Sequence, residues 1–375
     1  MGGNNKVISI VVPLYKGEKY IGQILDQVGK NARLVPELTV ELVLYNDYPD
    51  EDIVLADPVD CKNLEVKIVN SNENKGIHAA RVSGLNSSSG GFVVFLDQDD
   101  ILYPDYLRSQ IDAIGEGDVV VCKAIHDGKS HYSSSYRFEK VVTAEHLLNC
   151  WNSIVSPGQV LLKRSIIPQS WIDKPLKNNG ADDYYLWLLL AGMKVVFVHN
   201  DVILFEHTVK GDNTSLDTNR MMDSEDEMIG NLIDSGVFDN RGIEKLLELR
   251  KSLRRIHIKE LEDYREAYYC YLCFEGADLE RFHSKKIGIY GAGIIGRSLG
   301  KILARDKRVD IIYIDRNEAS ICVDAAVFSP QNIPDDIDII VVTPLPDRDK
   351  IAFDIKSQVK CKVYSLRSFI KDCLE

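Results

Sequence analysis

The chain has 375 residues, of which 45% are hydrophobic and 27% are charged, and its formal net charge is −12 at pH 7. This length predicts two or three domains of a globular protein, and the acidic charge argues against nucleic acid as a partner, because phosphate backbones bind basic surfaces. The first residues contain no signal-peptide core and no apolar run reaches the ~20 residues that cross a bilayer, so we expect a cytoplasmic protein without a transmembrane segment.

Apolar runs alternate with helical patterns in the first third of the chain. We expect strands at residues 7–12, 41–45, 66–69 and 92–96, and helices that begin near Ile21 and Ile77. Strands that alternate with helices at this spacing predict a parallel α/β sheet with helices on both faces. Two further apolar runs, residues 119–121 and 195–198, are expected to extend the sheet.

The fourth expected strand ends in three carboxylates, Asp97, Asp99 and Asp100. Side chains two apart in extended backbone point the same way, so we expect Asp97 and Asp99 to converge on one cation. Mg²⁺ and Mn²⁺ are usually held by one or two carboxylates together with substrate phosphates, and ligands of such sheets bind beyond the carboxyl ends of the strands. The alternative is an acidic, solvated loop, and Asp100 is expected to cap a helix that begins near residues 103–105.

Four further motifs accompany these acids. They are Val-Val-Pro-Leu-Tyr at 11–15, Asn-Asp at 46–47, Asn-Lys-Gly-Ile-His-Ala-Ala-Arg at 74–81 and Gly-Ala-Asp-Asp-Tyr-Tyr-Leu-Trp at 180–187. Together with residues 96–100, and in this order and spacing, they resemble a glycosyltransferase of family 2 over roughly residues 5–215. The resemblance implies the GT-A fold, a nucleotide-sugar-binding mixed sheet flanked by helices.

The same resemblance implies an inverting glycosyltransferase of the hexosyltransferase type. It would move a sugar from a nucleoside diphosphate sugar to a hydroxyl of a glycan or lipid-linked acceptor in surface polysaccharide biosynthesis. Family frequency favours a uridine diphosphate sugar as the donor. Asp97 is expected near the ribose and as a metal ligand, and Asp99 is expected to contact the Mn²⁺ or Mg²⁺ more directly.

Two adjacent carboxylates, Asp182 and Asp183, are candidates for the catalytic base that takes the proton of the acceptor hydroxyl. Alignment with the family places Asp183 at the base position and Asp182 where Glu is usual. Both precede an apolar helix, so a simple pair of N-cap residues is the alternative interpretation. Residues 151–159 and the loop 210–218 are expected to line the acceptor side.

The resemblance also implies residues that bind the substrate. Tyr15 is expected to stack on the nucleotide base, Asp47 to hydrogen-bond it, and Pro13, Lys75 and Gly76 to lie beside the donor. The chain departs from the family at two places near this base, because Lys16 stands where Asn is usual and Tyr48-Pro49 replaces a turn that usually contains Gly and Ser.

Two further substrate-binding candidates each have a structural alternative. Arg81 is expected to reach the diphosphate, since a guanidinium fork matches phosphate oxygens, or else to form an ion pair on the helix surface. His207 resembles a family histidine near the metal or the acceptor, or is a structural histidine.

We expect a helical linker at residues 218–284, between a transferase domain at 1–217 and a third domain at 285–375. Its leucines and isoleucines lie among arginines and lysines at helical spacing, which indicates either a face that rests peripherally on the inner membrane surface or a solvated helix between domains. Nearby acidic residues balance the charge and favour the second interpretation.

The last domain begins with a short strand and the glycine motif Gly291, Gly293 and Gly296, followed by a helix. Asp315 follows Gly296 by 19 residues, close to the ~20 expected of an acid that bonds a ribose hydroxyl. This predicts a small Rossmann-like α/β domain, which either binds NAD or another nucleotide or has a structural role. A nucleotide-sensing or NAD-dependent oxidoreductase protein that works from this site is the alternative function.

Overall fold

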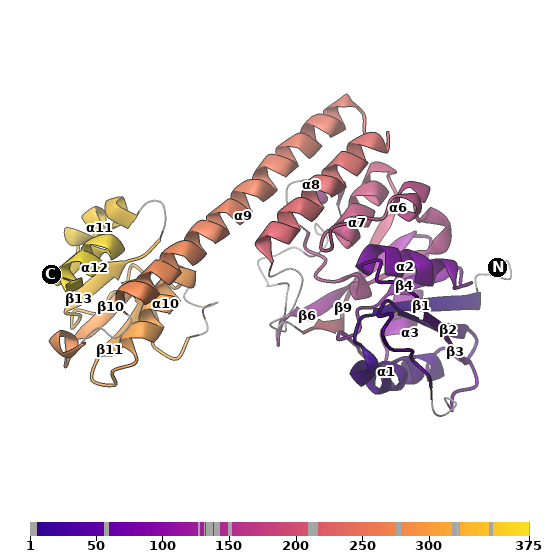
Figure 1. Ribbon diagram of the computed structural model, residues 1–375, viewed down its shortest axis with the longest axis horizontal. Coiled ribbons are helices and arrows are strands. Elements are labelled where there is room, and N and C mark those ends of the chain that lie inside the picture. The colour runs from indigo at the N-terminus through magenta and orange to yellow at the C-terminus, as the bar shows by residue number, and fades with distance from the viewer. Residues whose placement is uncertain are drawn as a thin grey trace. The chain divides into compact units, whose positions relative to one another are not determined.

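The computed structural model describes residues 6–55, 60–126, 128–130, 132, 138, 143–148, 152–208, 217–274, 279–316, 321, 323–344 and 348–374. The chain divides into two compact units, Met1–Arg255 and Ile256–Glu375 (Figure 1). No helix in the described part of the chain is both long and apolar enough to cross a membrane.

The first unit is built on one mixed sheet with the strand order β3-β2-β1-β4-β8-β6-β9-β5. Its strands are β1 (Val7–Leu14), β2 (Thr39–Asn46), β3 (Leu64–Asn70), β4 (Phe92–Phe95), β5 (Ile101–Leu102), β6 (Val119–His126), β7 (Lys129–Ser130), β8 (Val160–Lys163) and β9 (Phe197–His207). Strands β1 to β4 pair in parallel, β8 runs antiparallel to both β4 and β6, and β9 runs parallel to β6. Short β5 and β7 pair antiparallel with β9 and β6. The mixed α/β sheet that the resemblance implies is confirmed, and the strands expected at residues 119–121 and 195–198 extend it, the second from Phe197 onward. The parallel sheet expected from the alternation of strands and helices is wrong in part, because β8 runs antiparallel to both of its neighbours.

Helices cover both faces of this sheet, because its central strands are apolar on both sides. They are α1 (Ile21–Arg33), α2 (Ile77–Asn86), α3 (Tyr106–Ile114), α5 (Ala144–Leu147), α6 (Gln169–Asp173), α7 (Asp182–Gly192) and α8 (Thr218–Asp234). Successive residues of β1 point to opposite faces of the sheet and so belong to different hydrophobic clusters. Ile10 packs in the cluster that contains α1 and α3, whereas Val11 packs in the cluster that contains α2 and α7. Helix α7 lies deep in this second layer, and its stretch from Tyr185 to Leu190 is almost completely buried.

The second unit contains a five-stranded parallel sheet with the order β12-β11-β10-β13-β14. Its elements are β10 (Lys286–Tyr290), α10 (Ile294–Leu303), β11 (Asp310–Ile314), β12 (Val327–Phe328), β13 (Ile339–Val342), α11 (Arg348–Lys356), β14 (Lys362–Ser365) and α12 (Leu366–Leu374). Counted along the unit, the strands lie in the order 3-2-1-4-5, which doubly wound dinucleotide-binding sheets share. The expected small α/β domain is therefore present.

The 35-residue helix α9 (Asn240–Phe274) contributes to the cores of both units. Leu246, Leu249 and Leu253 pack in a cluster of the first unit, and Cys270 and Phe274 pack in a cluster of the second. The expected linker at residues 218–284 is thus helical, but its two ends are parts of the two cores. The division of the chain into three parts stays a prediction.

Candidate active site

The carboxyl ends of β1, β2 and β4 meet at one edge of the first sheet. Tyr15 follows β1, Asp47 follows β2, and Asp97 comes two residues after β4. The backbone N–H of Asp47 donates to the carbonyl of Leu14 at 2.8 Å, and Leu96 donates in the same way to Val11 at 2.9 Å. Because the strands are parallel, the motif residues that lie far apart in the sequence gather at this edge.

The acidic segment after β4 is a turn and not an extension of the strand. Strand β4 ends at Phe95, and the N–H of Asp100 donates back to the carbonyl of Asp97 at 3.2 Å. The alternation of side chains that we expected for Asp97 and Asp99 requires extended backbone, so this reason for their convergence is wrong. Asp97 and Asp100 instead both accept from Ser156, Asp97 at 3.4 Å and Asp100 at 2.5 Å.

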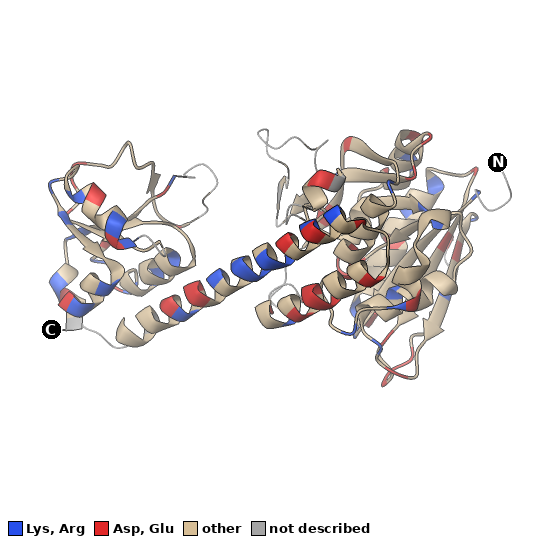
Figure 2. Cartoon of the chain, turned by 90° about the horizontal axis from the view of Figure 1, so that it is seen from above, with Lys and Arg blue, Asp and Glu red and all other residues tan. Residues whose placement is uncertain are grey.

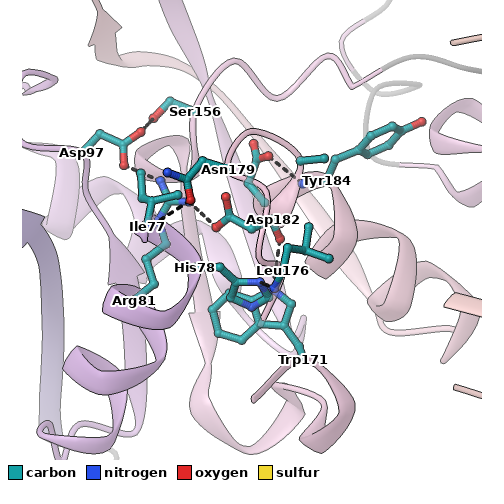
Figure 3. Close-up of polar contacts among 12 residues, drawn as sticks. Ile77, His78, Arg81, Asp97, Ser156, Trp171, Leu176, Asn179, Asp182 and Tyr184 are labelled. Atoms are coloured by element: carbon teal, nitrogen blue, oxygen red, sulfur yellow. Dashed lines mark hydrogen bonds and ion pairs between the residues drawn. The ribbon is translucent and has the colours of Figure 1, made fainter. Parts of the chain in front are cut away.

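Arg81, on the first turns of α2, joins the end of β4 to the start of α7 (Figure 3). Its Nη2 donates to Asp97 Oδ1, and its Nη1 donates to Asp182 Oδ2. Arg81 and Asp182 are 3% and 2% exposed. Burial alone would lower the pKa of Arg81, but the negative charges of Asp182 and Asp97 raise it above its ordinary value. The expected alternative of an ion pair on the helix surface is wrong, because this pair is buried.

Aromatic packing fixes the start of α7 against α2. The indole Nε1 of Trp171 donates to the carbonyl of Asp182 at 3.0 Å, and its ring lies 4.4 Å from that of His78 between centroids. His78 Nδ1 accepts from the N–H of Leu176 at 2.8 Å, and burial lowers its pKa to about 4, so the ring is neutral at pH 7. These contacts hold Asp182 in place behind Arg81 (Figure 3).

Asp183 lies in the first turn of α7 beside Asp182. Its Oδ1 accepts from the N–H of Tyr184 at 2.7 Å, and its Oδ2 accepts from Asn152 Nδ2 at 3.3 Å. Burial and the charge of Asp182 raise the pKa of Asp183 to about 7, against the opposing charge of Arg81. The N-cap of α7 is Ala181, so the alternative that the two acids are a pair of N-cap residues is wrong.

Asp100 is a fully buried residue that binds the end of β9 and not a helix cap. Its Oδ1 lies 2.7 Å from His207 Nδ1, and its Oδ2 accepts from Ser156 Oγ at 2.5 Å. Burial would lower the pKa of His207, but the bond to Asp100 and the charge of that carboxylate raise it. Helix α3 is instead preceded by Asp105 at its N-cap, so the expected cap role of Asp100 is wrong. Ser156 also donates to Asp97 Oδ2 at 3.4 Å.

The tyrosine after β1 is held to the acidic turn by Gln98. Gln98 Oε1 accepts from the N–H of Tyr15 at 3.0 Å, and its Nε2 donates to the carbonyl of Tyr15 at 3.3 Å. Tyr15 is 47% exposed and meets the ring of Tyr48 edge-on, with 5.4 Å between centroids. Lys16 adopts a left-handed backbone with φ of 51° and places its ammonium 5.5 and 5.3 Å from the two ring centroids. Lys16 and Tyr48, the two departures from the family motif, therefore both lie against Tyr15, the tyrosine expected to stack on the base.

Asp47 holds the loop that leads into α2. Its two carboxylate oxygens accept from the N–H groups of Lys75 and Gly76 at 3.0 and 2.9 Å. Gly76 has a φ of +84°, and a Cβ there would meet the side chain of Asn179 at 2.7 Å. Asn179 in turn accepts from the N–H of Ile77 at 3.2 Å, at the first residue of α2. Pro13 lies within β1, in register with Tyr45 of β2.

Sequence reasoning missed four residues of this edge, namely His78, Gln98, Trp171 and Asn179. Gln98 and His78 lie inside motifs that were recognised, so the signal was available for them. Trp171 and Asn179 act only through contacts made across the fold, which no local pattern indicates. Trp151 and residues 210–216, expected on the acceptor side, lie outside the described residues.

The carboxylates at the end of β4 fit a divalent cation that substrate oxygens complete. Asp97 and Asp99 are both partly exposed, and Mg²⁺ and Mn²⁺ accept such a partial set of hard oxygen ligands. Among the described residues, no three His, Cys, Asp or Glu side chains converge as a metal site of their own. Asp97 also accepts from Arg81 and Ser156. The more direct contact of Asp99 with the metal, which the resemblance implies, stays a prediction.

Two glycines of the motif in the second unit, Gly291 and Gly296, are required by the packing of their own loop. A Cβ on Gly296 would lie 1.9 Å from the carbonyl oxygen of Gly291, which itself has a φ of +95°. A Cβ on Gly293 would meet nothing within 4 Å. Asp315 Oδ2 accepts from the N–H of Ala292 at 2.8 Å. The carboxylate expected to bind a ribose hydroxyl is thus already bonded to the loop, and the nucleotide role of these four residues stays a prediction.

Comparisons with known proteins address the first unit. Residues 9–169 match the family model described as "Glycosyl transferase family 2". An "Uncharacterized glycosyltransferase" of Haemophilus influenzae is 31% identical over 120 residues, which are 32% of this chain and 46% of that protein. The "UDP-Glc:alpha-D-GlcNAc-diphosphoundecaprenol beta-1,3-glucosyltransferase WfgD" of Escherichia coli is 26% identical over 186 residues, 48% of this chain and 68% of that protein.

Two solved structures resemble part of the chain. Residues 1–349 of TarS from S. aureus, in complex with UDP-GlcNAc, give a TM-score of 0.48 at 17% identity, over 64% of this chain and 71% of that one. The mannosyltransferase PcManGT from Pyrobaculum calidifontis, in complex with GDP-Man and Mn²⁺, gives a TM-score of 0.47 at 16% identity, over 66% of this chain and 69% of that one. The chain spans less than half the length of the H. influenzae relative and 33% of "Putative glycosyltransferase EpsH" of Bacillus subtilis. Residues 9–169, within the first unit of this chain, are thus similar to glycosyltransferase family 2.

Proposed function

We propose that the protein is an inverting glycosyltransferase that moves a sugar from a nucleoside diphosphate sugar to a hydroxyl of a glycan or lipid-linked acceptor in polysaccharide biosynthesis. The observation that carries this proposal is the buried bridge of Arg81 between Asp97 and Asp182. It joins the donor side, at the end of β4, to the start of α7, where Asp183 lies.

Asp183 is the proposed base, and Asp182 positions it. Asp182 forms an ion pair with Arg81. Asp183 has a pKa of about 7, so its protonated and ionised forms are present in comparable amounts near neutral pH. A general base works best when its pKa lies near the working pH. The acceptor oxygen would attack the anomeric carbon from the face opposite the diphosphate. As that bond forms and the bond to the diphosphate breaks, Asp183 would take the hydroxyl proton, and the configuration would invert.

The donor would lie along the carboxyl ends of β1, β2 and β4. Tyr15 offers an exposed ring for the base, Asp47 and the Lys75–Gly76 loop lie at the end of the next strand, and His207 closes the side next to Asp100. Mn²⁺ or Mg²⁺ bound at Asp99 and Asp97 would neutralise the charge that develops on the departing diphosphate. The donor named for the E. coli relative is UDP-glucose, which supports a uridine nucleotide.

A panel of nucleoside diphosphate sugars tests this function. We expect the purified chain, with MnCl₂, to release nucleoside diphosphate slowly from one donor by hydrolysis and faster when a suitable acceptor is added. Asp183→Asn should lower acceptor-dependent release by about 10²- to 10⁴-fold, the usual contribution of a general base, without weakening donor binding. Asp173→Asn, which changes an exposed carboxylate at the end of α6, is the control. Full activity of Asp183→Asn would reject the assignment of the base, and no release from any donor would reject the function.

A further inference from the structure

Lys16, in the turn that follows β1, has a backbone conformation that suits few residues with side chains. Its φ of 51° lies in the left-handed region, which Gly adopts freely and which Asn and Asp tolerate best among the other residues. A lysine has no short polar group that could bond the local backbone, so its presence here costs free energy. Backbone outliers of this kind persist where neighbours fix them, and they cluster at functional sites.

The neighbours of Lys16 fix the direction in which its side chain leaves the turn. Gln98 bonds both the N–H and the carbonyl of Tyr15, the residue before it. A Cβ on Gly17, the residue after it, would lie 2.4 Å from Gln98 Oε1. The turn is therefore held closely against the acidic segment that follows β4, and the position of Lys16 is set before any ligand binds.

Lys16 differs from other lysines of the first unit in what its ammonium contacts. Acidic residues are spread over this unit among the basic ones (Figure 2). Lys30, Lys75 and Lys163, for example, each form an ion pair with a carboxylate. In the part of the chain that the structure describes, Lys16 forms no such pair, and its ammonium lies against two tyrosine rings instead.

These two rings place the ammonium beside the surface proposed for the base of the donor. Its Nζ lies 5.5 Å from the ring centroid of Tyr15 and 5.3 Å from that of Tyr48, which is the range of a cation–π contact. Tyr15 is 47% exposed, so one part of its ring is open to a ligand. A base that stacks on Tyr15 therefore has the ammonium next to it, and the flexible stem of a lysine lets the ammonium turn from the rings to the edge of the base.

An ammonium distinguishes bases by the groups on their edges. It has three donors and no acceptor, so it bonds a carbonyl oxygen but not an amino group. Uracil has carbonyl oxygens on both sides of its ring N–H, whereas cytosine has an amino group, a donor, in place of one of them. An amino group that faces the ammonium loses its bond to water and gains no partner, which weakens binding.

We propose that Lys16 is a specificity-determining residue, whose ammonium donates to a carbonyl oxygen of a uracil stacked on Tyr15 and so selects uridine over cytidine nucleotides. This inference rests on the proposed function, because it requires the base of the donor to lie at Tyr15. A contact of the same ammonium with the diphosphate would act equally on every nucleotide and would select none.

Isothermal titration of the full chain with UDP and with CDP, both with MnCl₂, tests the proposal. We expect tighter binding of UDP, and Lys16→Met should lower the ratio of the two affinities by about tenfold, the effect of one hydrogen bond from a charged donor. Lys19→Met is the matched control, because the exposed Lys19 also places its ammonium against a tyrosine, 4.9 Å from the ring centroid of Tyr20. It should leave both affinities unchanged.

Two further substitutions separate specificity from folding. Lys16→Asn should lose the preference for UDP but keep the melting temperature close to that of wild type, because Asn suits the left-handed backbone better than Lys. Lys16→Arg retains donors and should keep most of the preference.

Three results would overturn the proposal. An unchanged ratio of affinities in Lys16→Met would show that Lys16 does not select the base. An equal loss of UDP and CDP binding in that variant would assign the ammonium to the diphosphate and leave the proposed function intact. If wild type bound neither nucleotide, the proposed function would fail together with this inference.

Discussion

Replacing Arg81 with methionine would keep most of its volume and remove the guanidinium that bridges Asp97 and Asp182. The Asp182 side chain is 3% exposed, so it would be left as a buried charge without its partner. Loss of one partner from a buried ion pair costs about 3–5 kcal/mol. For a domain of this size each kcal/mol lowers the melting temperature by about 2–4 °C, so we expect the first unit to melt about 6–20 °C lower.

Differential scanning calorimetry at pH 7 measures this loss, with Arg108→Met as the control. Arg108 also pairs with two carboxylates, Glu37 and Asp112, but it lies at the surface, where such pairs contribute about 0–1 kcal/mol. Equal melting of the two variants at pH 7 would refute the buried bridge as a source of stability.

Three further predictions follow from the described residues. The rate of transfer should rise as the pH increases through about 7, because Asp183 must be ionised to take a proton, and a rate that is flat from pH 6 to 8 would contradict this. In urea unfolding, Gly296→Ala should lower the free energy of unfolding of the second unit by more than about 2 kcal/mol, because the new Cβ would meet the Gly291 carbonyl. Gly293→Ala is the comparison: its Cβ would meet nothing within 4 Å, so the free energy of unfolding should change by less than about 0.5 kcal/mol. The pKa of His78 is about 4 in the folded chain and 6.5 ordinarily, so as the pH falls the unfolded chain binds the proton first. The free energy of unfolding should therefore decrease between pH 6.5 and pH 4, by up to about 3 kcal/mol. His78→Gln should lose less over that interval, and an equal loss would count against a neutral buried histidine.

Apolar runs and turn residues predicted the strands and helices of the first sheet well, because local patterns determine these elements. The motif residues were also expected at the carboxyl edge, where β1, β2 and β4 bring Tyr15, Asp47 and Asp97. The catalytic and binding roles of these residues stay predictions.

The partners of the site residues were harder to predict, because they are distant in the sequence. Arg81 and Asp182 are 101 residues apart, and Asp100 and His207 are 107 apart. Asp100 looked like a helix cap because such caps are local, but its burial against β9 depends on the whole sheet. The two-sided role of α9 was missed for a similar reason, since the sequence shows a helix but not which face each unit buries.

Metal-dependent nucleotide binding tests the central claim most directly. Isothermal titration of the full chain with uridine diphosphate, with and without MnCl₂, would compare wild type with Asp99→Asn and with Asp315→Ala. We predict that Mn²⁺ strengthens binding, that Asp99→Asn removes this gain, and that Asp315→Ala in the second unit leaves it unchanged. Binding of uridine diphosphate that does not depend on Mn²⁺ and is lost in Asp315→Ala would contradict a donor site at the end of β4.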